Sequence, residues 1–251
     1  MNRSMRVSMW AVAALIAGCG GGGSAGSAPT PTPPPPPPPP PANAFAVNAA
    51  WRNLLSGSTT NNWTVTGTAS DGSAYSFGLS SAPAPSQVFP LTGTLYSAGD
   101  ITALVQIGSL GIHRTVNRSF YDPATFVVVG TQSTLDTNSP VCSVATASVA
   151  PPTSAAMAAS GAAPTGGPLQ SFNDMNSCVQ ASATKTGTSV TTWSLEADGA
   201  VNLFCLNTLS KDTADTTLQL ESDCFEIAQD GTLGTRARVT LARPSVVAKN
   251  Y

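Results

Sequence analysis

The chain has 251 residues, of which 41% are hydrophobic and only 10% are charged, and its formal net charge at pH 7 is −2. Two of the eleven basic residues, Arg3 and Arg6, lie in an N-terminal segment that we expect to be removed, which leaves nine basic residues against thirteen acidic ones. A nucleic-acid-binding surface needs clustered lysine and arginine. The composition therefore argues against DNA or RNA as a partner, and equally against electrostatic attachment to anionic lipid.

The first eighteen residues have the three parts of a bacterial export signal. The two arginines form a positive start, residues 9–17 form an apolar stretch, and small residues follow. A helix needs about 20 apolar residues to span a bilayer, so this stretch is too short to be a permanent anchor. We expect residues 1–18 to be a cleaved signal peptide.

A lipobox, the cleavage site of lipoprotein signal peptidase, ends the apolar stretch. Its four residues are Ile16, Ala17, Gly18 and Cys19. The small side chains before the cysteine admit the peptidase, and the thiol accepts a diacylglycerol. Several acyl chains, such as palmitate, then hold a protein to a membrane far more firmly than one. The sequence thus predicts a membrane lipoprotein, and an ordinary signal in which Cys19 is incidental is the alternative.

The residue after the cysteine bears on the destination of the lipoprotein. Gly20, and no acidic residue, follows Cys19. By resemblance to enterobacterial sorting rules, this implies transfer to the outer membrane, with the domain facing the periplasm or the cell surface.

Residues 19–43 form a tether between the lipid and the folded part. Residues 20–28 contain only Gly, Ser and Ala, which predicts a flexible coil. Residues 29–41 end in nine consecutive prolines. Proline fixes φ and lacks an N–H, so this run predicts an extended polyproline II segment of roughly 40 Å, at about 3.1 Å per residue. We interpret it as a stiff spacer, and a ligand for a polyproline-binding module is the alternative.

The remaining chain is long enough to bury one hydrophobic core. Residues 80–87 are rich in Ser, Ala and Pro, and residues 150–167 consist largely of Ala, Ser, Pro, Gly and Thr. The second stretch predicts a low-complexity surface loop, or a linker between a β-rich N-terminal half, 44–149, and a β-meander C-terminal half, 168–251.

Apolar residues after position 60 alternate with polar ones, and Val, Thr, Phe, Tyr and Trp are frequent, which predicts strands. One short helix is expected at the start of the domain, where Val47, Trp51 and Leu54 share a face. The expected strands are 63–69, 74–79, 101–107, 112–119, 125–130, 186–196, 201–206, 216–221, 224–228 and 232–242. The sequence therefore predicts an all-β fold, an antiparallel meander of hairpins that forms a sandwich or a barrel-like domain, or two stacked halves.

Asp-Gly occurs three times between expected strands, and its glycines are Gly72, Gly199 and Gly231. Asp-Gly between strands usually forms a two-residue turn. A third loop residue, however, places the apolar side chains of both strands on one face, and a slip by one residue would turn them all over. This register pairs Trp63 with Leu79, Val65 with Phe77, Trp193 with Leu203, Leu195 with Val201, and Ile227 with Leu233. We expect all three glycines in the left-handed region.

Four cysteines remain besides Cys19, namely Cys142, Cys178, Cys205 and Cys224. An even number in an exported chain implies disulfides, and four cysteines allow three pairings. We favour the local pairs Cys142–Cys178 and Cys205–Cys224. A metal centre would need thiolates at short spacing such as C-x-x-C, which the chain lacks. We therefore expect no metal and no cofactor.

The sequence offers few candidates for catalysis. His113 is the only histidine, and the expected β domain contains no G-x-S-x-G motif, so a Ser-His-Asp mechanism is disfavoured. The densest acidic group comprises Asp212, Asp215, Glu221 and Asp223. Two of its carboxylates in a cleft would suit a glycosidase, but their spacing does not fit a calcium-binding EF-hand loop.

The order of lipobox, glycine run, proline run and Thr/Ser/Gly-rich β domain resembles uncharacterised lipoproteins of β-proteobacteria. The specific part of this resemblance is the first nineteen residues and the tether, and it implies a membrane location without a function. We expect a non-enzymatic binding or structural module of the cell envelope, with a protein, a glycan or a small apolar ligand as its partner. The alternative is an envelope hydrolase that acts on glycan or peptidoglycan through paired carboxylates.

Overall fold

The computed structural model describes residues 43–57 and 60–251. The lipobox, Cys19 and the proline run lie outside the described residues, so the lipoprotein assignment stays a prediction. Within the described part of the chain, no helix is both long enough and apolar enough to cross a bilayer.

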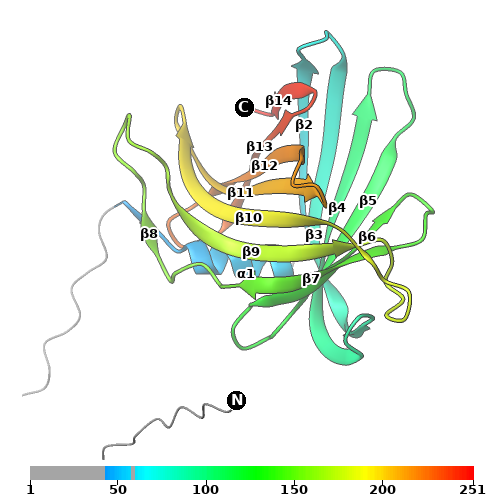
Figure 1. The fold of residues 1–251 in the computed structure, drawn as a ribbon. Helices are drawn as coiled ribbons and strands as arrows, with labels where there is room; N and C mark the ends of the chain where they lie inside the picture. Colours follow the sequence, from blue (N-terminus) through cyan, green and yellow to red (C-terminus); the bar gives the residue numbers. More distant parts are fainter. Residues whose placement is uncertain (1–42, 58–59) are drawn as a thin grey trace, which may run out of the picture. The chain divides into compact units, whose positions relative to one another are not determined.

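Twelve antiparallel strands of the described residues close into a barrel (Figure 1). They are β2 (Asn61–Ala69), β3 (Ala74–Phe89), β4 (Thr94–Ile107), β5 (His113–Tyr121), β6 (Val128–Leu135), β7 (Val141–Ser148), β9 (Thr165–Met175), β10 (Lys185–Asp198), β11 (Val201–Asp212), β12 (Thr217–Ile227), β13 (Leu233–Ala242) and β14 (Ser245–Lys249). Strand β7 pairs with β9, and β14 pairs with β2. Both halves of the chain therefore build one barrel, which confirms the all-β, barrel-like expectation.

A helix and a second, small sheet lie at one end of the barrel. The helix α1 (Val47–Ser56) follows β1 (Ala44–Phe45), which pairs with β8 (Ala155–Ala156). The expected helix is confirmed, because Val47, Trp51 and Leu54 are 0%, 3% and 1% exposed. We call this the helix end, and the opposite rim the far end.

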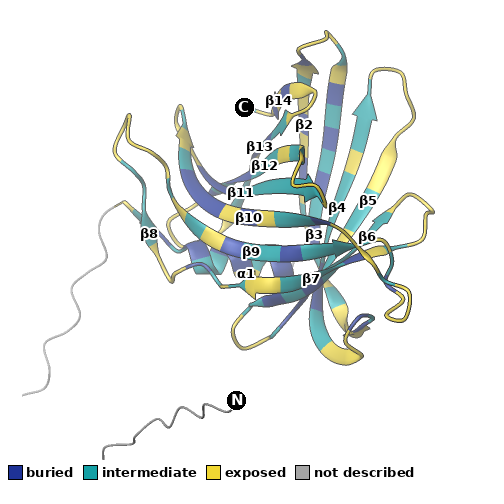
Figure 2. Cartoon of the chain, viewed as in Figure 1, coloured by how far each residue is buried: buried dark blue, intermediate teal, exposed yellow. Residues whose placement is uncertain are grey.

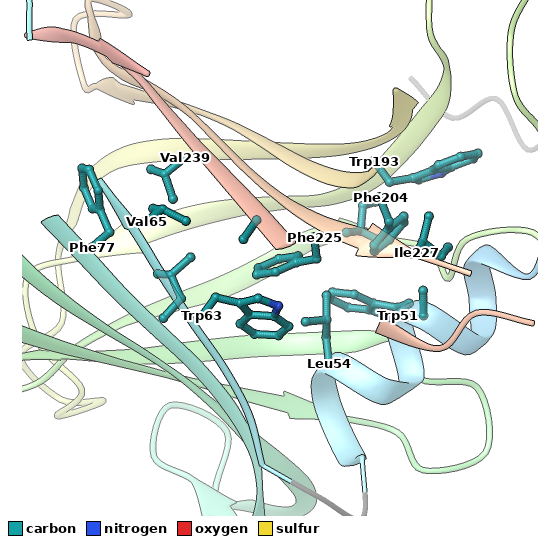
Figure 3. Close-up of a cluster of buried hydrophobic side chains, with 14 of the residues drawn as sticks. Trp51, Leu54, Trp63, Val65, Phe77, Trp193, Phe204, Phe225, Ile227 and Val239 are labelled. Carbon is teal, nitrogen blue, oxygen red and sulfur yellow. The ribbon is translucent and has the colours of Figure 1, made fainter. Parts of the chain in front are cut away.

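The barrel buries its apolar side chains inward. Strand β2 illustrates the alternation, since Trp63 and Val65 are buried while Thr64 and Thr66 are exposed. Figure 3 shows Trp63 beside Phe225, with ring centroids 4.4 Å apart, and α1 packed against the same cluster. The indole N–H of Trp63 donates to the carbonyl of Gly234 at 2.8 Å, so the buried polar atom is satisfied.

The strands are longer and more numerous than the sequence indicated. Residues 80–87 belong to β3, because pairing with β4 overrides their weak strand propensity. The expected strands 216–221 and 224–228 are the single strand β12. Strands β7, β9 and β14 were not expected. β6 begins only at Val128, since the preceding residues form a turn in which Phe126 has a φ of 58°.

Two of the three predicted hairpin registers are confirmed. Val65 pairs with Phe77, and Ile227 pairs with Leu233. In both hairpins the loop holds three residues and ends in a glycine with positive φ, which is 87° at Gly72 and 85° at Gly231.

The third predicted register is wrong. Leu195 pairs with Phe204 rather than with Val201, and Trp193 pairs with Leu206 rather than with Leu203. The glycine of this turn does have the expected positive φ, 63°.

The third register differs from the predicted one because apolar side chains are also buried on the outer surface of the barrel. Val201 and Leu203 face outward but are 4% and 0% exposed, because they pack with the disulfide of Cys205 and Cys224 and with Tyr251. Both faces of the sheet are thus covered here, so apolar residues no longer mark the inward face.

Both disulfides of the local pairing are present. Cys142 is bonded to Cys178, 36 residues away, and Cys205 is bonded to Cys224 on the neighbouring strand. The first closes across residues 150–167, which contain β8 and the start of β9.

Candidate functional site

A groove of about 550 Å³ crosses the outward face of strands β9 to β12. This volume lies within the range of about 300–1,000 Å³ that is typical of small-molecule sites. The lining residues are Thr146, Ser171, Phe172, Asn173, Thr188, Val190, Thr192, Asn207, Leu209, Lys211, Asp215 and Leu220. The strands that carry it arch across the front of the barrel in Figure 1, and Figure 2 shows exposed residues along β10.

Three aliphatic side chains form the floor of the groove. Val190 pairs with Leu209, and Leu209 pairs with Leu220, so the three lie in one row across β10, β11 and β12. Val190 is 41% exposed and Leu220 is 48% exposed. Single exposed apolar residues are ordinary, but an aligned row in a concave surface is typical of a binding site.

Polar side chains flank the apolar row on both sides. Toward the far end, Thr188 pairs with Lys211, whose ammonium group lies 2.9 Å from Asp215. Toward the helix end, Thr192 pairs with Asn207. The groove therefore combines an apolar floor with hydrogen-bonding groups and one exposed ion pair.

The Asn207 side chain is fixed by its own hydrogen bonds. Its amide N–H donates to Ser194 at 2.9 Å, and its carbonyl oxygen accepts from Ser222 at 2.6 Å. The wall of the groove at this position is thus ordered without a ligand, as a preformed site requires.

The acidic group picked out in the sequence is divided between two places. Asp212 accepts the backbone N–H groups of Ala214 and Thr216, each at 2.9 Å, in the turn after β11. Glu221 and Asp223 instead occupy successive inward-facing positions on β12, as their pairing with Leu241 and Val239 shows.

Burial raises the pKa of Glu221, and it raises the pKa of Asp223 well above its ordinary value, to which the nearby charge of Glu221 adds. The Oδ1 atom of Asp223 is buried and has no hydrogen-bond partner among the described residues. Neither carboxyl lines the groove. The paired carboxylates required for the hydrolase alternative therefore do not flank the ligand-sized groove.

The single histidine makes a contact that the sequence did not indicate. His113 Nδ1 lies 2.9 Å from Asp136, whose second oxygen accepts the N–H of Arg114 at 2.8 Å. These bonds lower the pKa of Asp136, with the Arg114 N–H as the larger cause. The imidazole is 59% exposed, and no serine of the described chain bonds to it. The pair resembles two members of a catalytic triad without the nucleophile.

A cluster on the outer face surrounds the second disulfide. Arg238 donates to Glu196, and its guanidinium also lies 3.3 Å from the sulfur of Cys224. Burial raises the pKa of Tyr251 to about 12, and so does its hydrogen bond to Asp198. Glu196 and the two sulfurs are close enough to hold a metal ion, but both cysteines are oxidised in the disulfide and offer no thiolate.

The floor of the groove was not predicted from the sequence, although the sequence contains a signal for it. Val190 is out of phase with Trp193 and Leu195 of the same strand, and Leu209 is out of phase with Phe204. An apolar residue on the polar phase of several neighbouring strands indicates an outward apolar row. Comparisons of the chain with protein-family models, with curated proteins and with solved structures find no match.

Proposed function

We propose that this protein is a lipid-anchored, non-enzymatic binding protein of the bacterial cell envelope, and that the groove on β9 to β12 holds a small amphipathic molecule. The observation that carries the proposal is the aligned row of Val190, Leu209 and Leu220 within a polar rim. An apolar body would cover this row, while hydroxyl or charged groups would reach the rim. The volume of the groove, about 550 Å³, suits a small molecule.

The anchor part of the proposal rests on the predicted lipid at Cys19. Two or more acyl chains would hold the folded domain at a membrane far more firmly than one. We propose the outer membrane as the location.

The binding part is tested with 1-anilinonaphthalene-8-sulfonate, a fluorescent probe with an apolar body and one charged group. We expect saturable, single-site binding. Leu209→Asn should weaken it about five- to tenfold, because roughly half of a leucine side chain's burial, about 1–1.4 kcal/mol, is lost. The control is Thr64→Asn, on the outward face of β2 and outside the groove. Equal affinity of both variants, at unchanged melting temperature, would refute the groove as the site.

A further inference from the structure

Five exposed aliphatic side chains lie on neighbouring loops at the far end of the barrel. The loop between β4 and β5 contains Leu110 and Ile112, the turn between β6 and β7 is flanked by Leu135 and Val141, and the loop between β9 and β10 contains Val179. Each of the five is between 43% and 62% exposed. Strands β4, β5, β6, β7 and β9 follow one another in the barrel wall, so these loops, which are largely exposed in Figure 2, form one sector of the rim. We call it the apolar sector.

A polar contact joins the first two of these loops. His113 Nδ1 lies 2.9 Å from Asp136 Oδ2, and the backbone N–H of Asp136 donates to the carbonyl of Arg114 at 2.7 Å. Ile112 and Leu135 directly precede His113 and Asp136 in the chain. The contact therefore keeps these two aliphatic residues on adjacent parts of the rim.

A disulfide joins the β6–β7 turn to the β9–β10 loop. It links Cys142 to Cys178, whose Cα atoms are 4.9 Å apart. Val141 directly precedes Cys142, and Val179 directly follows Cys178. Both cysteines are buried whereas both valines are exposed, so the covalent link holds two apolar side chains at the surface. An ordered sector of this kind loses less conformational entropy on binding than separate mobile loops would.

Large apolar residues are confined to this part of the far-end turns. The three remaining turns at this end, residues 70–73, 213–216 and 243–244, contain no Leu, Ile, Val, Met or aromatic residue. The loops of the apolar sector hold one acidic residue, Asp136, which is engaged by His113 and by the N–H of Arg114. The Arg114 side chain is exposed and takes part in none of the ion pairs among the described residues. The sector therefore combines projecting aliphatic groups with one free guanidinium.

We propose that the apolar sector inserts into the interface of a phospholipid bilayer, with the Arg114 guanidinium bound to a lipid phosphate. Exposed aliphatic side chains that project from several loops do not enclose a small ligand, and none of them lines the groove on β9 to β12. They suit the boundary between lipid headgroups and acyl chains, which adapts to their shape. A guanidinium beside them favours phosphate, which it binds through paired N–H donors.

The predicted anchor at Cys19 is compatible with this orientation. The tether joins the folded domain at β1 and α1, at the helix end, whereas the apolar sector lies at the far end. Residues 19–42 can extend over roughly 75–85 Å at about 3.1–3.6 Å per residue, and β4, with 14 residues, spans about 45 Å along its own direction. The tether is thus long enough for the far end to face the anchoring bilayer, and an anchor would raise the effective concentration of lipid at the rim. The proposal itself depends on neither the anchor nor the groove.

The experiment places a fluorescent reporter on the apolar sector. Ile112→Trp in the full chain is mixed with vesicles of phosphatidylglycerol and phosphatidylcholine, the latter brominated on its acyl chains, so that an indole that enters the acyl region loses its emission. Native Trp51, Trp63 and Trp193 are at most 5% exposed, and the difference from the wild type isolates the added indole. Burial of several aliphatic side chains favours the inserted state at least about tenfold. We therefore expect the added indole to lose most of its emission at saturating lipid.

The matched control is Thr64→Trp, exposed on the outward face of β2, which should keep its emission. Addition of Leu110→Ser and Val179→Ser to the Ile112→Trp chain should lower the ratio of inserted to free protein at least about fivefold, because two apolar side chains are lost. Addition of Arg114→Gln should lower the same ratio about fivefold, because one cation near the lipid phosphates is lost. Leu110→Trp is a second reporter should the first fail to fold.

Full emission from both Ile112→Trp and Leu110→Trp would overturn the proposal, whether or not the chain floats with the vesicles, since flotation reports the acyl anchor separately. Equal quenching of Thr64→Trp would overturn it as well, because the bilayer would then contact the barrel wall without preference for the rim. A blue shift of the added indole that appears without vesicles and grows with protein concentration would show that a second copy covers the apolar sector, and would also overturn the proposal.

Discussion

Substitution of Gly99 by alanine tests the packing of α1 against the barrel. A Cβ at this position of β4 would lie 2.0 Å from the carbonyl oxygen of Leu55 and 2.8 Å from its carbonyl carbon. These atoms belong to the backbone of α1, so no side-chain rotation relieves the clash and the helix itself has to move. Overpacking a core costs about 1–3 kcal/mol, and an obstacle made of backbone places this case near about 3 kcal/mol.

For a domain of this size, each kcal/mol lowers the melting temperature by about 2–4 °C, so Gly99→Ala should melt about 6–12 °C below the wild type. Thermal unfolding followed by far-UV circular dichroism measures the difference. Gly78→Ala on the neighbouring strand β3 is the control, because its Cβ would meet only the Leu104 side chain at an ordinary 3.5 Å. If Gly99→Ala melts like Gly78→Ala, α1 does not pack against β4 as described.

Three further predictions concern charge, covalent links and the anchor. Asp223→Asn should raise the melting temperature at neutral pH and change it less in acid, because the raised pKa of Asp223 in the folded state means that wild-type stability falls as pH rises from the unfolded pKa through the folded one. Melting series from pH 4 to 8 that are parallel for both proteins would contradict this. Replacing Cys205 and Cys224 together by alanine should cost about 3 kcal/mol in urea unfolding, as expected for a loop of 19 residues; no shift of the midpoint would show that the link adds no stability. Cys19→Ala should abolish incorporation of alkyne-palmitate and release the protein from the membrane fraction, and retained labelling would place the lipid elsewhere.

Local patterns in the sequence were sufficient to predict the strand register where only one face of the sheet is covered. The register of β2 and β3 follows from Trp63 and Val65, because the opposite face, with Thr64 and Thr66, is exposed. The same reasoning failed at β10 and β11. There Leu203 is buried on the outer face, under Tyr251, and no local pattern in β11 reports that contact.

The unexpected strands share a different cause. Strand β7 has the sequence Val-Cys-Ser-Val-Ala-Thr-Ala-Ser, whose small side chains give little alternation. It exists because β6 and β9 supply hydrogen-bonding partners on both sides. Barrel closure is a property of the whole chain, which explains why a barrel could be expected only as one of several all-β arrangements.

The candidate site was accessible to sequence reasoning in part. The acidic residues of β12 were noticed as a group, but the inward direction of Glu221 and Asp223 depends on the register with β11 and β13. The groove depends on three strands placing Val190, Leu209 and Leu220 in one row. A single leucine or valine does not indicate a binding site, since isolated exposed apolar residues are common.

Native mass spectrometry of the full chain, extracted from its own membranes in a mild detergent, tests the central claim most directly. We predict an acylated species that begins at Cys19, contains both disulfides and carries one retained small molecule, which the variant Leu209→Asn loses. A species that lacks acyl chains would contradict the lipid anchor. A retained molecule that survives in Leu209→Asn, or its absence from the wild type, would contradict the groove as the binding site.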